Sequence, residues 1–389
     1  MLTSNSNNKK NRILRKISHQ PIDMIKNHGK IIYENMLLYN FSSNDYLGLS
    51  KNEKLIRGSI EWVKKFGTSL SSSRLISGNA DFIEEIEDKI KINYSSKSCI
   101  IFGSGYQLNT TAIPAILGNP SKNSNDWAIF CDKFNHSSIY VGSQISGQKI
   151  IRYNHLDMDH LEKFLNKEKR LKKIIISESV FSMDGDVVDI KSLRYLAKKY
   201  NCILYVDEAH ATGIFGTHGY GITEQRNDKN ENEITVGTFS KAFGSYGSYM
   251  CCSKKIKKNI INYCSGFVYT TSLPPNVLGS INAAVDEMPK LSKKRKRLIE
   301  NSNYLRKYIN EIGFNTLNSK TNIIPIKKDI KTNYVKIRNY LLKKGFFTSV
   351  IRPPTVPYGM DRIRVSVTSH LNKKILNKFI SCLKSFEKK

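Results

Sequence analysis

The chain has 389 residues, of which 40% are hydrophobic and 24% are charged. This composition supports a buried core and excludes a chain that is disordered throughout. No window approaches the roughly 18–20 consecutive apolar residues that a membrane helix needs. The polar, basic segment 1–16 lacks the apolar core of a secretory signal, although its lack of acidic residues leaves a short organelle presequence open. We expect a cytoplasmic protein without a membrane partner.

Lys and Arg outnumber Asp and Glu by 62 to 33, which gives a formal net charge of +29. The run 293–297 (KKRKR) would suggest phosphate binding in isolation. The basic residues are nevertheless spread over the whole chain, and no nucleic-acid motif accompanies them. We therefore expect solvated lysine faces and no nucleic-acid partner, and a salt-dependent DNA shift would test the alternative.

The cysteines are seven in number, scattered, and without a Cys-x-x-Cys pair. An odd, scattered set fits reduced thiols better than a disulfide framework or a zinc site. We expect no metal.

Residues 1–45 are predicted to form an N-terminal arm with a short strand at 38–41, followed by a turn at 42–48 (SSNDYLG). Apolar residues at helical spacing predict helices over 54–66 and 81–94. The segment 67–78 between them is too rich in Ser and Gly for the interior of a helix or strand.

From residue 98 to about 272, short apolar runs alternate with helix-like segments. Continuous apolar strands separated by helices indicate a mainly parallel sheet with helices on both faces. Ligands bind such sheets at the carboxyl ends of the strands. We therefore predict a large domain over 46–285. Its seven expected strands are 98–102, 127–131, 149–153, 173–177, 202–206, 234–238 and 249–252.

Residues 286–389 have a different pattern, with a Lys-rich helix at 291–312 and a final helix. This pattern predicts a smaller C-terminal α+β domain. Its other expected elements are strands at 321–327, 347–351 and 362–368 and a helix at 332–344.

The strongest local signal for chemistry is Lys241, which follows an apolar strand in 238–244 (TFSKAFG). Phe239 and Phe243 flank it, and a lysine in such a pocket loses hydration. Its pKa should therefore fall, which enables Schiff-base formation.

A second motif lies upstream, at 206–213 (VDEAHATG). Asp207 at a strand end can pair with a protonated heterocyclic nitrogen, and such an anion keeps a pyridinium charged so that the ring acts as an electron sink. His210 can reach the phenolic oxygen of the same ring. A strand-end Asp, its neighbouring His and a strand-end Lys in this order indicate pyridoxal 5'-phosphate (PLP).

The sequence also offers groups for the rest of that cofactor. Gly105 and Tyr106 lie where a strand leads into a helix, so backbone N–H groups can face a phosphate. Thr238 offers a hydroxyl beside the lysine, and His136 is placed to stack on the ring.

With these motifs the chain resembles the α-oxoamine synthases, PLP enzymes of transferase fold type I that condense an amino acid with an acyl thioester. The resemblance runs from about residue 38 to 385, and within the family 351–357 (IRPPTVP) resembles the branch that makes 8-amino-7-oxononanoate. The other matching segments are 42–48 (SSNDYLG), 74–79 (RLISGN), 178–186 (ESVFSMDGD), 207–213 (DEAHATG), 238–241 (TFSK) and 269–275 (YTTSLPP).

The resemblance implies a role for each matching residue. Lys241 would carry the cofactor and shuttle protons, Asp207 would pair with the pyridine nitrogen, and His136 would stack on the ring. The residues implied near the phenolic oxygen are His210 and Ser182. Those implied at the phosphate are Gly105, Tyr106 and Thr238, with Thr270 and Thr271 from a second subunit. Those implied at the substrates are Arg364 and Asn44 for the amino-acid carboxylate, Thr355 for the acyl group, and Arg15 in the N-terminal arm.

The implied reaction joins L-alanine to a pimeloyl thioester, carried by coenzyme A or an acyl carrier protein, in a homodimer with shared active sites. A sister synthase that uses glycine or another acyl group, and a degraded PLP-binding protein, are the alternatives. One departure from relatives is 69–73 (SLSSS), where they carry a Gly-rich run near the substrate. Ser and Leu adopt positive φ at a cost that Gly avoids, so this loop bears on the acyl-donor site.

Overall fold

The computed structural model describes residues 14–18, 29–118, 126–170, 172–224 and 232–387. Its largest feature is a seven-stranded sheet with strand order β4-β10-β9-β8-β7-β5-β6. Six of these strands run in the same direction, and only β10, between β4 and β9, runs in the opposite direction. The strands are β4 (Ser98–Phe102), β5 (Trp127–Asp132), β6 (Lys149–Tyr153), β7 (Lys172–Glu178), β8 (Ile203–Asp207), β9 (Glu233–Thr238) and β10 (Ser248–Cys252). The prediction of a mainly parallel seven-stranded sheet is confirmed.

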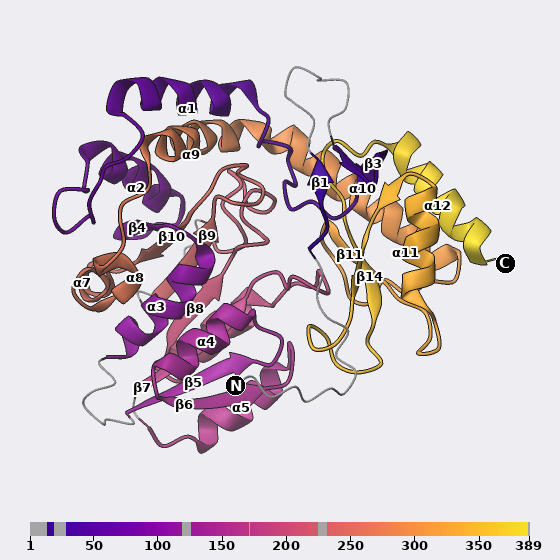
Figure 1. Cartoon of the computed structure of the whole chain (residues 1–389). Helices are drawn as coiled ribbons and strands as arrows, with labels where there is room; N and C mark the ends of the chain where they lie inside the picture. Colours follow the sequence, from indigo (N-terminus) through magenta and orange to yellow (C-terminus); the bar gives the residue numbers. More distant parts are fainter. Residues whose placement is uncertain (1–13, 19–28, 119–125, 171, 225–231, 388–389) are drawn as a thin grey trace, which may run out of the picture.

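Helices cover both faces of this sheet (Figure 1). On β5, Ile129 and Cys131 pack into one cluster while Ala128 and Phe130 pack into another, as the two-residue period of a strand requires. The helices over the first cluster are α3 (Gly105–Leu117), α4 (Ser137–Ile145), α7 (Lys254–Tyr263) and α8 (Ser265–Val268), and those over the second are α5 (Met158–Lys167) and α6 (Ile190–Lys199).

The two helices predicted before the sheet are α1 (Glu53–Phe66) and α2 (Asp81–Asn93). Helix α1 lies alongside α9 (Pro275–Glu287) (Figure 1). They approach closely because both carry glycine at the crossing: a Cβ on Gly279 would lie 2.3 Å from the carbonyl oxygen of Gly58.

The C-terminal part is α+β, as predicted. A three-stranded antiparallel sheet has the order β11-β14-β13. Its elements are η3 (Met288–Leu291), α10 (Ser292–Glu311), β11 (Ile323–Ile326), α11 (Tyr334–Lys343), β13 (Ser349–Ile351), β14 (Arg362–Ser366) and α12 (Lys373–Glu387).

The N-terminal strands β1 (Ile17–Ser18), β2 (Lys30–Tyr33) and β3 (Met36–Asn40) form a second small sheet with β12 (Phe346–Phe347). The single strand predicted over 347–351 is wrong, because β12 pairs with β3 while β13 pairs with β14. The backbone changes partners at Thr348, and no local pattern marks that change. The domain boundaries at 45 and 285 stay predictions.

None of the helices in the described ranges is both long and apolar enough to cross a membrane. All seven cysteines are free thiols. Among the described residues, no group of three or more His, Cys, Asp or Glu side chains could hold a metal ion.

Candidate active site

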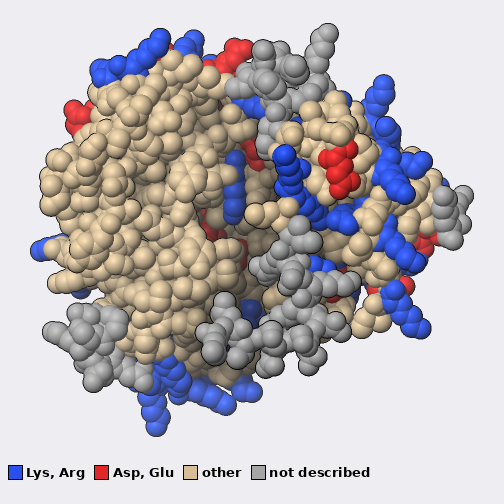
Figure 2. All heavy atoms as spheres, in the orientation of Figure 1, with Lys and Arg blue, Asp and Glu red and all other residues tan. Residues whose placement is uncertain are grey.

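A cavity of about 220 Å³ lies at the carboxyl ends of β7, β8 and β9, where the α3 and α4 helices begin. The space-filling view shows the molecule hollowed between the seven-stranded sheet and the C-terminal part (Figure 2). The lining includes seven of the predicted site residues: Gly105, Tyr106, His136, Asp207, His210, Thr238 and Lys241.

Asp207 is the last residue of β8 and is buried. Its Oδ2 accepts a hydrogen bond of 2.8 Å from Asn109 Nδ2, and its Oδ1 accepts one of 2.9 Å from the backbone N–H of Ala209. Asn109 is held in turn by the Tyr205 hydroxyl, which donates to Asn109 Oδ1 at 2.6 Å. These contacts fix the carboxylate of Asp207 at the cavity wall. Asn109 was not predicted as a site residue, although it lies one helical turn after Gly105.

Lys241 lies in the loop after β9 and lines the same cavity. Burial lowers the pKa of Lys241 to about 8; the carboxylates of Asp207 and Glu178 oppose this shift, and the Arg364 charge adds to it. A lysine with such a pKa holds more of its neutral, nucleophilic amine at neutral pH than an ordinary lysine does.

His210 is buried, and its Nδ1 lies 2.7 Å from the hydroxyl of Tyr46. That hydroxyl also donates to Oδ1 of Asn44 at 3.1 Å. Burial, with the nearby charges of Lys241 and Arg364, holds the pKa of His210 well below its usual range. The ring is therefore a neutral, oriented group. Tyr46 lies in the 42–48 segment of the resemblance, but no role was predicted for it.

The start of α3 offers an anion site. The Ser104 hydroxyl caps the helix by accepting from the backbone N–H of Gln107 at 3.2 Å. The N–H groups of Gly105 and Tyr106 lie in the first turn, where a helix provides no internal partners. Thr238 donates its hydroxyl to the carbonyl of Gly247 at 3.0 Å.

The Thr238 hydroxyl also lies 2.8 Å from that of Ser240, a cavity residue that was not predicted. His136 caps α4, and its Nδ1 accepts from the backbone N–H of Ser138 at 3.3 Å. The His136 ring is thus fixed at the mouth of the cavity.

Glu178 is a cavity residue that we did not single out. It ends β7 and lies opposite Asp207 in the parallel register of β7 and β8. The residue is 3% exposed, and its Oε1 has no hydrogen-bond partner among the described residues. Burial, reinforced by the charge of Asp207, raises the pKa of Glu178 well above its usual range. Glu178 is thus a buried carboxyl group whose charged form is disfavoured. Its position at a strand end, like that of Asp207, was the available signal.

Arg364 lies on β14 and is not among the residues that line the cavity, but its charge acts on His210 and Lys241. Its Nε donates to the carbonyl oxygen of Ser182 at 2.6 Å, and a terminal nitrogen donates to the Ser366 hydroxyl at 3.1 Å. Ser182 is therefore linked to Arg364 through its backbone carbonyl.

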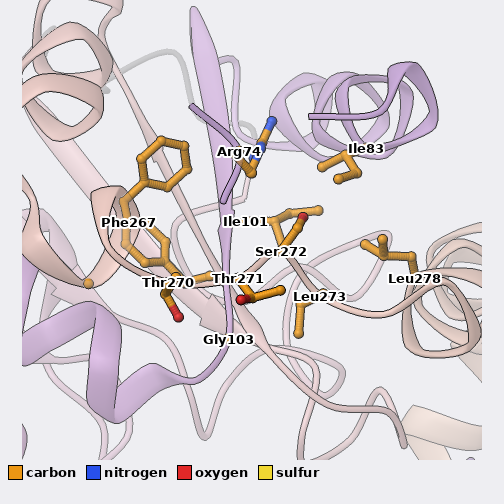
Figure 3. Close-up of a pocket in the computed structure, with 12 residues that line it drawn as sticks. Arg74, Ile83, Ile101, Gly103, Phe267, Thr270, Thr271, Ser272, Leu273 and Leu278 are labelled. Atoms are coloured by element: carbon orange, nitrogen blue, oxygen red, sulfur yellow. The ribbon is translucent and has the colours of Figure 1, made fainter. Parts of the chain in front are cut away.

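Thr270 and Thr271 line a separate pocket of about 20 Å³ beside Arg74 and Phe267 (Figure 3). Thr271 pairs with Ser73 through an isolated antiparallel bridge. The two threonines are not among the residues that line the cofactor cavity of their own chain.

Five further predicted residues also lie outside the set of described residues that line the cavity: Arg15, Asn44, Ser182, Thr355 and Arg364. Thr355 is exposed in a turn, where its N–H donates to the carbonyl of Arg352 at 3.1 Å. The guanidinium of Arg15 lies 5.3 Å from the ring centre of Phe347 in β12.

The cavity residues fit PLP. The α3 N-terminus suits a phosphate, the carboxylate of Asp207 suits a ring nitrogen, and the Lys241 amine suits an aldehyde.

The chain resembles known proteins over almost its whole length. The family model for aminotransferase class I and II matches residues 38–383. The 8-amino-7-oxononanoate synthase of Gluconacetobacter diazotrophicus is 37% identical over 89% of this chain and 87% of its own. A Paramagnetospirillum magneticum protein given that name provisionally is 36% identical over 96% of this chain and 93% of its own.

A solved structure of serine palmitoyltransferase (SPT) with its PLP internal aldimine has a TM-score of 0.86 and 25% identity to this chain. The match covers 92% of this chain and 90% of that chain. The fold, the cavity and these similarities agree on one assignment. The chain belongs to the aminotransferase class I and II family, and it is a PLP-dependent acyltransferase of fold type I.

Proposed function

We propose that this enzyme condenses L-alanine with a pimeloyl thioester to give 8-amino-7-oxononanoate, CO₂ and a free thiol, a step of biotin biosynthesis. The thiol carrier is coenzyme A or an acyl carrier protein. The observation that carries the proposal is the position of Lys241, whose pKa is about 8, in one cavity with Asp207. The names of the relatives and the 351–357 segment support the choice of substrates.

Each group around the cavity has a proposed task toward the cofactor. The N–H groups of Gly105 and Tyr106 and the hydroxyl of Thr238 bind the phosphate. Asp207 accepts from the ring nitrogen, and His136 stacks on the ring. His210, with Ser182, faces the phenolic oxygen. Bound PLP supplies an electron sink for the carbanion at the substrate α-carbon.

Lys241 performs the proton transfers. Its Nζ takes the α-proton of alanine, and a C–C bond then forms between the α-carbon and the thioester carbonyl carbon as the thiol leaves. The carboxylate of alanine departs as CO₂, and a proton returns to the α-carbon. A lysine whose pKa is close to neutral exchanges protons effectively in both directions.

Arg364 is the proposed partner of the alanine carboxylate, with Asn44 nearby. Its guanidinium offers two parallel, charge-assisted hydrogen bonds. Thr355 and Arg15 remain the proposed acyl-side contacts.

The proposed assembly is a homodimer with shared active sites. Figure 2 shows few charged side chains over α2, α3, α7 and α8, although the chain carries 62 Lys and Arg residues. Large apolar side chains are exposed on α3 and α7 and in the loops beside α2, α8 and β10: Tyr106 (53%), Tyr263 (69%), Ile76 (82%), Tyr269 (86%) and Tyr246 (55%). We take this weakly charged face together with these side chains as the proposed interface, because a contiguous exposed apolar surface marks protein contacts. A second chain packed there brings Thr270 and Thr271 to the phosphate of its partner.

A sister synthase is the second candidate, because the SPT structure resembles this chain closely. Turnover of alanine with pimeloyl thioesters, compared with glycine and succinyl-CoA and with serine and palmitoyl-CoA, separates the candidates. Mass spectrometry should detect 8-amino-7-oxononanoate from the first pair. Faster turnover of either other pair would overturn the proposal.

A further inference from the structure

We propose that His155 is a positioning residue, which clamps the 180–187 hairpin between two carboxylates so that the hairpin holds Arg364 toward the cavity. This inference rests on the proposed role of Arg364 at the amino-acid carboxylate. His155 lies in the loop after β6, outside the cavity.

The His155 ring bridges two aspartates. Its Nδ1 lies 2.9 Å from Oδ1 of Asp132 and its Nε2 lies 2.7 Å from Oδ2 of Asp186. The rings of Phe134 and Phe181 pack on it at centroid distances of 4.5 and 4.4 Å. The side chain is 13% exposed.

Both ring nitrogens must donate, so His155 is an imidazolium. A neutral imidazole has one donor and one acceptor nitrogen, whereas ionised carboxylates only accept. Asp132 also accepts from the backbone N–H groups of Phe134 at 2.8 Å and Leu156 at 2.9 Å, which fits an ionised carboxylate. Burial alone would lower the pKa of His155, but the hydrogen bonds and charges of Asp132 and Asp186 raise it to about 9.

The hairpin held by His155 crosses from one part of the molecule to the other. It is closed by a bridge between Val180 and Val187. At its tip, Gly185 has φ +69°, and a Cβ there would lie 2.1 Å from the carbonyl oxygen of Ile323 in β11. The carbonyl of Gly185 accepts from the backbone N–H of Lys320 at 2.9 Å. The tip is thus seated on the C-terminal sheet.

Two contacts link the hairpin to β14. Ser182 accepts from Arg364 Nε at 2.6 Å, and Asp184 forms an ion pair with Arg362. The Arg362 side chain is only 1% exposed, so this ion pair is sheltered from water. Loss of the His155 clamp would release one end of the hairpin and with it the Ser182 carbonyl that orients Arg364.

Charged groups face His155 from each neighbouring element. Asp132 comes from the end of β5, and Asp184 and Asp186 come from the hairpin. The Lys133 ammonium lies 5.7 Å from the centre of the Phe134 ring that stacks on His155. The two carboxylates in direct contact therefore set the charge state of His155, and the more distant Lys133 does not reverse it.

The first test compares His155→Asn with His160→Asn. His160 is a matched control in the first turn of α5: its ring Nδ1 accepts from the Asn154 N–H at 3.1 Å. Its backbone N–H, which the substitution keeps, donates to Oδ1 of Asp157 at 2.8 Å. Hydrogen exchange of the apoprotein reports the 180–187 segment, and absorbance titration of the PLP-loaded enzyme with L-alanine reports amino-acid affinity.

In His155→Asn we expect faster exchange in 180–187 and an alanine dissociation constant raised about tenfold, since loss of one hydrogen bond to a charged group weakens binding by about that factor or more. PLP affinity should change less than twofold, and His160→Asn should match the wild type in both measurements. Unchanged exchange, or faster exchange with unchanged alanine affinity, would overturn the inference. If Arg364→Lys itself leaves alanine affinity unchanged, the proposed role of Arg364 fails instead, and exchange alone then decides the clamp.

A second variant keeps the test valid if His155→Asn does not fold. Asp186→Asn preserves shape and removes one charge from the clamp. Ring signals of ¹³C-labelled histidine in the apoprotein should then show the His155 titration moving down from about 9. A His155 titration that is the same in wild type and Asp186→Asn would contradict the clamp.

Discussion

The cofactor cavity and the Arg364 region are built in different ways. The cavity takes its key groups from the ends of neighbouring strands of one sheet, with Glu178 opposite Asp207 in register. Arg364 instead depends on a hairpin that leaves this sheet and is seated on another. Since a sheet fixes strand ends rigidly, the cavity should tolerate distant changes. The Arg364 region should respond to any change in the contacts between the two parts of the molecule.

The largest effect expected is within the cavity. Lys241→Ala should lower turnover by about 10²–10⁴-fold, the range for loss of a positioned acid–base group. It should also abolish the borohydride-reducible bond to PLP, because no other described lysine lines the cavity. Visible absorbance and mass spectrometry after reduction check this. Covalently held PLP in the variant would assign the role to another lysine.

Asp207→Asn should reduce α-proton exchange of alanine in deuterated water by about 10²–10³-fold, the cost of removing one preorganised charge-stabilising group. The side-chain amide oxygen of the variant can still accept the hydrogen bond from the Ala209 backbone N–H, so the fold should persist. Proton NMR of alanine follows the exchange. Exchange near the wild-type rate would remove Asp207 from its proposed role.

Arg364→Lys tests the second region. Lysine lacks the planar fork, so alanine binding should weaken by roughly 1.5–3 kcal/mol, the range for one hydrogen bond to a charged group. Absorbance titration measures the affinity. Arg352→Lys is the comparison, since it makes the same change at an arginine in the 351–357 segment, outside β14. If only the Arg352 variant weakens binding, the carboxylate contact belongs there.

The His155 clamp predicts a pH dependence of stability. The pKa of His155 is raised from 6.5 to about 9, so the folded state binds the proton more tightly than the unfolded state. Its stabilisation is therefore complete below about pH 6.5 and is lost as the pH rises through about 9. Denaturant unfolding of wild type and His155→Asn apoprotein should show a difference of roughly 1–3 kcal/mol that disappears over this window. A difference independent of pH would contradict the imidazolium.

The smallest effect expected is at the Ser-rich loop. Ser71 has φ +54°, a conformation in which a side chain costs about 1–2 kcal/mol. Ser71→Gly should stabilise the chain by about 0.5–1 kcal/mol after the added entropy cost of glycine. Ser73→Gly, without that strain, should destabilise it slightly. Thermal unfolding of both variants makes the comparison, and equal shifts would contradict the strain argument.

The sequence by itself determined the large sheet and the cofactor groups. Continuous apolar runs predicted all seven strands; Asp207 directly follows the 202–206 run, and Lys241 lies three residues after the 234–238 run. The carboxyl ends of parallel strands meet at one edge, so residues that follow those runs converge without further information. For that reason the PLP cavity was predictable from the order of its motifs.

Only the tertiary structure decided which groups surround these residues. Tyr46 meets His210 across 164 positions of sequence, and His155 meets Asp186 across 31. The raised pKa of Glu178 follows from burial beside Asp207, and the change of partners at Thr348 follows from pairing with β3. Local patterns record which face of an element is buried. They do not record which distant side chain lies against it, because burial, charge and hydrogen bonding at a contact are set by the assembled fold.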